Sequence, residues 1–326
     1  KYKEETNIHS RLGGKLRAEL NKIGEIGNAP LLPLEKLLAE KDAFLRLRST
    51  QAVLLTRYQG LLASRSFQDF TRPRAESPIP NLLAWLTLAR VHVMLAMIDA
   101  EDGRWPEAAD ALLRQVDFAK MAVAGSRVLV TNLIGKAVLV MSLQGLGYLM
   151  NQPACPAEVF SRVLAALPPI RVEEYGSRNA FIGEFLFLRS SIETIDSRGK
   201  RFGWGWAKEL AASLLLQKNR TLNGHFRRIQ SFIRMEADPL PGDADAILAP
   251  ERWRRGAFWW LRNPVGKTLL EIMLPNLGVV VFKSQRARSI YDMTRISAEL
   301  HWRYDPSRSV PENLNLLETY RQTPDP

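Results

Sequence analysis

The chain has 326 residues, with 45 Lys and Arg against 34 Asp and Glu, so its formal net charge is +11. Hydrophobic residues make up 46% of the chain and charged residues 24%, proportions that exclude wholesale disorder and indicate a globular protein. The single cysteine excludes an intramolecular disulfide framework and a thiolate-rich zinc site. The four histidines lie far apart in the sequence, so we expect neither a metal centre nor a cofactor.

The positive charge is compatible with nucleic-acid binding, because Lys and Arg neutralise phosphates. The basic residues are dispersed along the chain rather than gathered in a tail, and most of them are arginines, which a GC-rich genome also favours. We therefore do not expect nucleic acid to be the main partner. A basic surface that faces an acidic protein or an anionic membrane fits the same charge.

Apolar residues recur with a 3.6-residue period along almost every long segment, which predicts an all-α protein. The first helical segment covers residues 31–64, either as one amphipathic helix or as a broken pair. A basic, proline-punctuated linker at 71–80 follows it. The next three predicted helices cover 81–100, with Asn81 as the N-cap, 106–124 and 128–150.

The second half of the chain continues the helical pattern. Further helices are predicted at 157–166, 172–197, 206–219, 222–237, 264–274 and 279–304, the last two separated at Pro275. A loop rich in Pro, Gly and Asp, residues 238–250, is the best internal boundary. It divides a helical-hairpin array, 1–237, from a C-terminal helical segment, 251–326, that packs on the array; one continuous domain is the alternative.

The helix–turn–helix of residues 82–120 resembles a degenerate tetratricopeptide-type hairpin. The matching positions are the large–small pair Leu95 and Ala96, the turn residue Gly103, the aromatic Trp105 and the small Ala108. The match covers about one repeat, and Gln115 and Lys120 depart from the pattern. The resemblance implies helices that approach closely, and hence stacked antiparallel helical hairpins that are solenoid-like in the first half of the chain.

A second resemblance covers more of the chain. Residues 118–138 are similar to a segment of poorly characterised all-helical bacterial proteins, as are the motifs at 263–267, 303–304, 311–314 and 325–326. Those proteins typically carry an N-terminal membrane anchor and an envelope-facing helical domain. The resemblance implies a periplasmic domain held at the inner membrane by one anchor upstream of Lys1, and it implies no reaction. A cytoplasmic protein is the alternative.

Two segments combine tryptophan with arginine. Their residues are Trp204 and Trp206 in the first segment, and Arg252, Trp253, Arg254, Arg255, Trp259 and Trp260 in the second. Trp and Arg are enriched at protein interfaces and also suit the headgroup layer of an anionic bilayer. Packing of the tryptophans between helices, with arginine stacked on them, is the third interpretation.

One carboxylate is a candidate for acid–base chemistry. Glu184 lies between Arg178 and Arg189 in a predicted helical region and has phenylalanines on both sides. A buried carboxylate in apolar surroundings has a raised pKa and can act as a general acid or base. A structural ion pair with one of the arginines is the other interpretation.

An arginine-rich stretch follows His225. Helical spacing brings Arg227 and Arg234 close to one face together with Ser231. On that face they would either bind an anion or point into solvent.

The sequence therefore predicts a non-enzymatic helical scaffold or assembly factor of the bacterial cell envelope that binds another protein. Its alternatives are an enzyme with a pocket centred on Glu184 and a basic nucleic-acid-binding protein. No residue of the sequence forms a recognisable catalytic motif.

Overall fold

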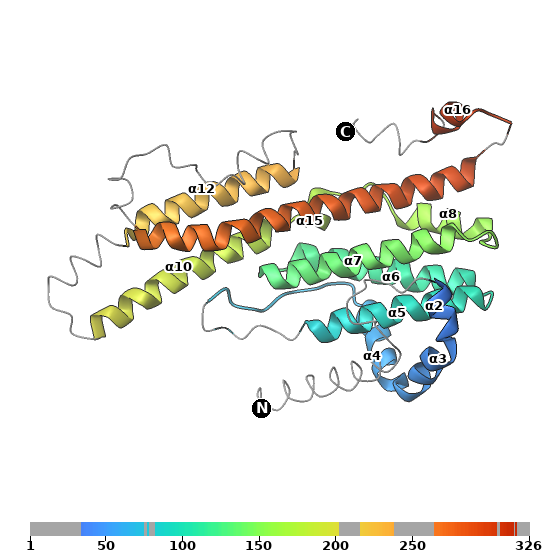
Figure 1. Cartoon of the computed structure of the whole chain (residues 1–326), viewed down its shortest axis with the longest axis horizontal. Coiled ribbons are helices and arrows are strands. Elements are labelled where there is room, and N and C mark those ends of the chain that lie inside the picture. Colours follow the sequence, from blue (N-terminus) through green and yellow to red (C-terminus); the bar gives the residue numbers. More distant parts are fainter. Residues whose placement is uncertain are drawn as a thin grey trace.

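The computed structural model describes residues 34–74, 77, 82–201, 216–237, 264–304, 307–315 and 317, and these residues form helices and connecting loops with no strand (Figure 1). The predicted all-α class is confirmed.

Three short helices open the described chain: α2 (Leu34–Ala39), α3 (Lys41–Thr50) and α4 (Ala52–Leu62). The segment predicted as one helix or a broken pair is thus divided twice, at Glu40 and at Gln51. Leu37, Phe44 and Tyr58 are buried and join the main core, so these helices cover one side of the molecule.

Three long antiparallel helices form the core: α5 (Leu83–Glu101), α6 (Trp105–Gly125) and α7 (Leu129–Met150). Their bounds agree with the predictions to within two residues, although Asn81 lies outside the described residues. Gly103 turns the chain between α5 and α6 with a φ of 86°, a value that glycine adopts without steric cost. Ala96 and Ala108 are both buried, as a close approach of the two helices requires.

By length and composition, α5 and α7 would each be able to cross a membrane, but 56% and 61% of their apolar windows are buried inside the fold. Helix α7 packs against α5, α6, α10 and α15. A helix surrounded by other helices is apolar on all sides. The central position of α7 therefore accounts for its composition.

The next elements are α8 (Ala157–Ala166), α9 (Val172–Tyr175) and α10 (Arg178–Arg201). Helix α8 has the predicted bounds, but the single helix predicted at 172–197 is wrong. The chain leaves the helix at Gly176 and Ser177, because Asn132 of α7 donates to the Gly176 carbonyl and Glu236 accepts the Ser177 N–H. At this break the Gly176 carbonyl and the Ser177 N–H thus bond to other helices rather than within their own.

The C-terminal part contains α12 (Lys218–Ala237), α15 (Pro264–Arg303) and α16 (Val310–Asn315). Helix α12 is continuous across the predicted break between 219 and 222. Helix α15 is also continuous, with 40 residues that run through Pro275, where the sequence predicts an interruption. Leu277, Val280 and Val281 are buried directly after the proline, and this packing offsets the hydrogen bond that proline removes.

Helix α15 connects the two parts of the molecule. Its first half packs on α12, and its second half continues in the same direction across α7 and α8 (Figure 1). Helices α10, α12 and the first half of α15 form an end that projects beyond the core, with its own apolar cluster around Phe181, Ile229 and Phe232. The predicted boundary loop 238–250 lies outside the described residues, and repeated hairpin stacking stays a prediction.

Candidate functional site

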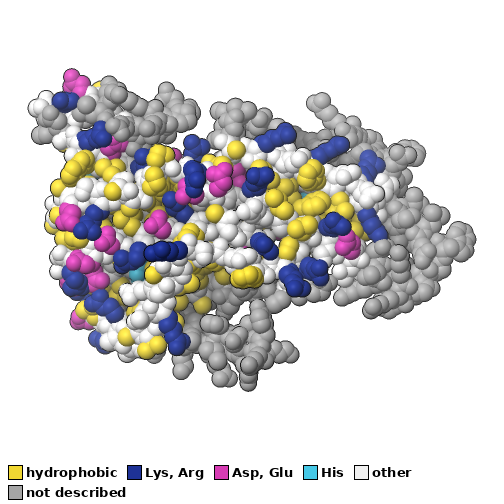
Figure 2. Space-filling model, turned by 180° about the vertical axis from the view of Figure 1, so that it is seen from behind, with side chains coloured by type: hydrophobic (Ala, Val, Ile, Leu, Met, Phe, Trp, Pro, Cys, Tyr) yellow, Lys and Arg dark blue, Asp and Glu magenta, His cyan; other side chains and the backbone are white. Residues whose placement is uncertain are grey.

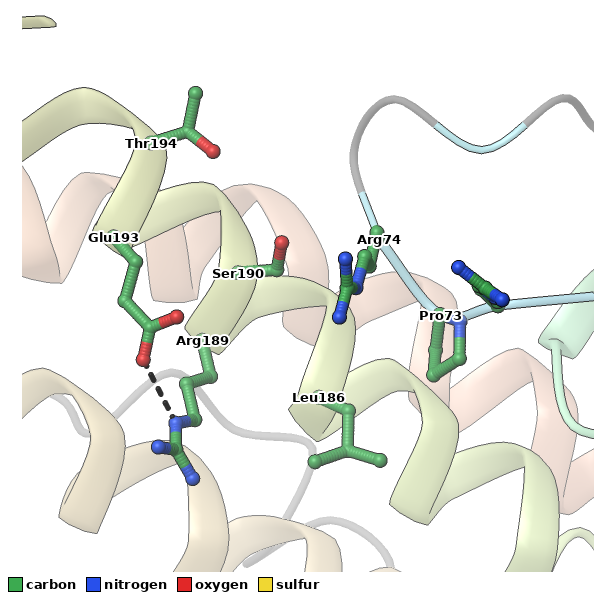
Figure 3. A pocket seen from close by; sticks show the side chains of 8 residues that line it. Pro73, Arg74, Leu186, Arg189, Ser190, Glu193 and Thr194 are labelled. Carbon is green, nitrogen blue, oxygen red and sulfur yellow. Dashed lines mark hydrogen bonds and ion pairs between the residues drawn. The ribbon is translucent and has the colours of Figure 1, made fainter. Parts of the chain in front are cut away.

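A groove of about 640 Å³ separates the loop after α4 from the exposed side of α10. We call it the arginine groove; it is lined by Arg72, Pro73, Arg74, Leu186, Arg189, Ser190, Glu193 and Thr194. Figure 3 shows Pro73 and Arg74 of the loop opposite Leu186 and Ser190 of α10.

The loop is held in place by a buried carboxylate. Asp69 accepts the backbone N–H of Thr71 at 2.9 Å and that of Arg127 at 3.0 Å. Burial alone would raise the pKa of Asp69, but hydrogen bonds from Thr71 and Arg127 hold the pKa below its ordinary value. The carboxylate is therefore ionised at neutral pH and ties the loop to the turn between α6 and α7.

A glycine of helix α10 allows this helix to lie directly against the same turn. A Cβ atom on Gly183 would lie 1.7 Å from the carbonyl oxygen of Arg127, so only glycine permits this approach. One turn earlier, Asn179 donates from Nδ2 to the Ala124 carbonyl at 2.9 Å. The turn at 124–127 thus sets the distance between α10 and the loop, and with it the width of the arginine groove.

The arginine groove carries a net positive charge, from three arginines and one glutamate. Arg189 donates from Nε to Glu193 Oε1 at 2.9 Å. Arg72 and Arg74 are exposed, and their guanidinium groups have no ion pair within the part of the chain that the structure describes. Two cationic groups thus stay available beside the apolar surfaces of Pro73 and Leu186.

A second cavity, of about 520 Å³, lies where α9 and the start of α10 meet the end of α12. We call it the α9 cleft; its lining includes Val172, Glu173, Gly176, Arg178, Asn179, Gln230, Ile233, Arg234 and Glu236. An ion pair of 2.8 Å between Lys120 of α6 and Glu174 of α9 holds the short helix in position.

Behind the α9 cleft, four helices meet at a buried polar cluster. Lys136 of α7 donates to the hydroxyls of Ser177 and Ser284 and lies 3.7 Å from Glu236 Oε1. Glu236 Oε2 accepts the Ser177 N–H at 2.7 Å, and Ser284 donates to Oε1. Asn132 accepts from the Ser177 hydroxyl through Oδ1 at 3.1 Å. Lys136 and Glu236 are each only 2% exposed. Their charges are therefore stabilised by partners within the protein rather than by water.

Burial lowers the pKa of Lys136 to about 8, against the opposing effect of Glu236. A lysine that contacts two serines is an arrangement that can activate a nucleophile. Here both serines are also held by other partners and are buried, at 1% exposure or less. The cluster therefore serves to fix the positions of α7, α10, α12 and α15.

The three residues of the predicted Glu184 pocket are not brought together. At 100° per residue, Glu184 lies about 120° around α10 from Arg178 and about 140° from Arg189. Arg178 lines the α9 cleft and Arg189 lines the arginine groove, whereas Glu184 lines neither cavity. Burial raises the pKa of Glu184, and no described cation pairs with it.

The predicted tryptophan and arginine interface lies outside the described residues. These residues are Trp204, Trp206, Arg252, Trp253, Arg254, Arg255, Trp259 and Trp260. They belong to the segments that connect α10 to α12 and α12 to α15 in the sequence. Figure 2 shows hydrophobic side chains gathered over the end formed by these helices, with Lys and Arg around them. The exposed large hydrophobic residues of the three helices include Ile182, Leu186, Phe187, Phe226, Val279 and Phe282.

His225 and the single cysteine, Cys155, line neither the arginine groove nor the α9 cleft. His225 is fully buried and stacks on Phe185 with ring centroids 6.2 Å apart, and neither of its ring nitrogens has a hydrogen-bond partner among the described residues. Burial raises the pKa of the Cys155 thiol to about 11, which disfavours the reactive thiolate. Among the described residues, no group of His, Cys, Asp or Glu side chains is arranged to hold a metal ion.

Sequence reasoning did not identify Asp69, Lys136 or Glu236. Lys136 had a usable signal, because it is the only charged residue between 129 and 150 in an otherwise apolar helix. The sequence holds no signal for Glu236 or for the contact of Asp69 with Arg127, since these partners are distant in the sequence.

Comparisons with known protein families, with curated proteins and with solved structures find no match to this chain.

Proposed function

We propose that the protein is a non-enzymatic helical scaffold or assembly factor that binds an acidic, partly apolar segment of another protein in the arginine groove. The observation that supports this most is the exposed pair Arg72 and Arg74, which face α10 across a cavity of about 640 Å³ without a described ion-pair partner. A rigid helical array, such as the tetratricopeptide resemblance implies, is a suitable frame for such a groove.

The chemistry of the groove favours a peptide with carboxylates and an apolar anchor. Arginine binds carboxylates through two parallel hydrogen bonds and is enriched among the residues that dominate binding energy at protein interfaces. Pro73 and Leu186 offer an apolar surface between the arginines. An acidic segment would place its carboxylates on Arg72 and Arg74 and an apolar side chain on Leu186.

The described residues give less support to an enzyme. Glu184 is isolated from both arginines of its predicted pocket, and the Lys136 cluster has its hydrogen-bonding groups engaged within the protein. A scaffold needs only the surface that the groove provides.

The bacterial envelope is part of the proposal and rests on the sequence resemblance alone. Fractionation of the native host with an antibody against the protein tests it. Recovery with the membrane and periplasmic fractions is expected, and recovery only with the cytosol would contradict it.

Charge reversal in the full-length protein tests whether the arginine groove binds the partner. We expect R72E/R74E to reduce co-purification of crosslinked partner proteins at least tenfold, because like charges repel an acidic segment. Quantitative mass spectrometry of the captured proteins is the measurement.

The matched control is R46E/R57E, which introduces the same charge change on exposed arginines of α3 and α4. This control should retain the partners. Equal loss in both variants, or no loss in R72E/R74E, would show that the arginine groove does not bind the partner.

A further inference from the structure

The α9 cleft brings together two cationic side chains from different helices. Arg178 is the first residue of α10, and Arg234 lies in the last turn of α12. Both are exposed, and neither guanidinium has an ion pair or hydrogen bond within the described part of the chain. Two like charges on one small cavity repel each other unless an anion lies between them.

The acidic residues of the cleft compensate only part of the charge of the two arginines. Glu236 has both carboxylate oxygens engaged by Ser177, Ser284 and Lys136, so its charge is already matched by the buried lysine. Glu173 is the other acidic residue of the lining; it is exposed and makes no described ion pair. Counted together with Lys136, which lies behind the lining, the cleft has three positive and two negative side chains, an excess of one positive charge.

The remaining lining is suited to a small organic molecule. Gln230 contributes an amide, and the Asn179 amide is fixed by its bond to the Ala124 carbonyl, which leaves its oxygen as an acceptor. Val172 and Ile233 supply apolar walls. A volume of about 520 Å³ is in the range of small-molecule sites.

We propose that the α9 cleft binds a small anionic ligand, with a carboxylate or phosphate group held between Arg178 and Arg234. Both groups are recognised by arginine through the same paired hydrogen bonds. This site is separate from the arginine groove and does not depend on the function proposed for it.

A ligand in this position would connect α10 to α12. Both helices already meet through Glu236, which accepts the N–H of Ser177 immediately before α10. Binding would therefore stabilise the folded protein by mass action, in addition to neutralising the two arginines.

Isothermal titration calorimetry of the full chain with inorganic phosphate and, separately, with succinate tests the proposal. We expect at least one of the two anions to bind when present at about 10 mM, and the anion that binds identifies the ligand class. R178Q/R234Q should weaken that binding at least tenfold.

Two further variants make the test specific. E173Q should tighten binding about threefold, because it removes from the lining a negative charge that repels the anion. R46Q/R57Q, which removes two exposed arginines elsewhere, should bind as the wild type does. Absence of binding by both anions, or equal affinity in R178Q/R234Q and the wild type, would overturn the proposal.

Discussion

At the scale of single residues, the shape of the arginine groove depends on close backbone contacts. Gly183 permits α10 to lie against the carbonyl of Arg127, and Asp69 ties the loop to the N–H of the same residue. Both walls of the groove thus contact the backbone of one residue, Arg127, and a side chain added at position 183 would push α10 away from it.

Gly183→Ala is expected to destabilise the fold by more than about 2 kcal/mol, because its Cβ atom would lie 1.7 Å from the Arg127 carbonyl oxygen. Gly147→Ala is the control: nothing lies within 4 Å of its Cβ, and alanine favours the helix by about 0.5–1 kcal/mol. Urea denaturation of both variants measures the difference. Similar free energies of unfolding for the two variants would contradict the contact.

His225 makes stability depend on pH. Burial, with a smaller contribution from Arg228, lowers its pKa from 6.5 to about 4, so the folded state resists protonation. The unfolded state binds the proton first, and stability is lost as the pH falls from 6.5 towards 4.

H225F should remove this contribution, which is on the order of 2 kcal/mol. At pH 7 its stability should differ from the wild type by less than about 1.5 kcal/mol, because His225 makes no hydrogen bond within the part of the chain that the structure describes. Urea denaturation at pH 7 and pH 4.5 gives the comparison. An identical pH dependence in the variant and the wild type would show that His225 is not buried in its neutral form.

These residues show what local patterns predict. The helical period and the small size of the residues predict that Ala96 of α5 and Ala108 of α6 are buried, and both are. The importance of Gly183 does not follow from such patterns, because nothing near it in sequence indicates that the backbone at Arg127 approaches it. The same holds for Arg178 and Arg189, which helical spacing predicts on one face but which line two different cavities.

At the scale of elements, the Lys136 cluster joins the central helix to the projecting end. Lys136 contacts the residue before α10, a residue of α12 and a residue of α15. A buried pair of this kind is costly to break from one side, because the remaining charge has no partner.

K136M is expected to destabilise the protein by about 3–5 kcal/mol, because it leaves Glu236 charged and buried. K136M/E236Q should recover most of this loss, since the amide oxygen can still accept the Ser177 N–H. A double variant no more stable than K136M would show that the two residues are not coupled.

The contribution of Lys136 to stability depends on pH. Its pKa is about 8 in the folded protein and near 10.5 when unfolded, so the unfolded state binds more protons between these values. Its contribution to stability therefore increases as the pH rises from 8 to 10.5. The difference between the wild type and K136M should grow over this range, and a constant difference would contradict the lowered pKa.

The breaks between elements are where sequence and structure differ most. Helix α10 starts at Arg178 because residues of other helices bind the carbonyl of Gly176 and the N–H of Ser177. Helix α15 crosses Pro275 because Leu277 and its neighbours are buried beyond it. Proline and capping signals are local, whereas these two outcomes are decided by residues from other helices.

At the scale of the whole molecule, the arginine groove lies between the core and the projecting end. Its loop belongs to the N-terminal side of the core, and its other wall is α10. Three of the arginines that contribute to the overall charge of +11, Arg72, Arg74 and Arg189, line this groove. Composition alone does not predict that they lie together.

Site-specific photocrosslinking in the native host shows whether another protein occupies the arginine groove. A photoreactive residue is placed at Ser190 inside the groove and, as a control, at the exposed Ser49 of α3. We expect a protein adduct from position 190 that is absent from position 49 and is lost in the R72E/R74E background. No protein adduct from position 190, or one that persists unchanged in R72E/R74E, would contradict it.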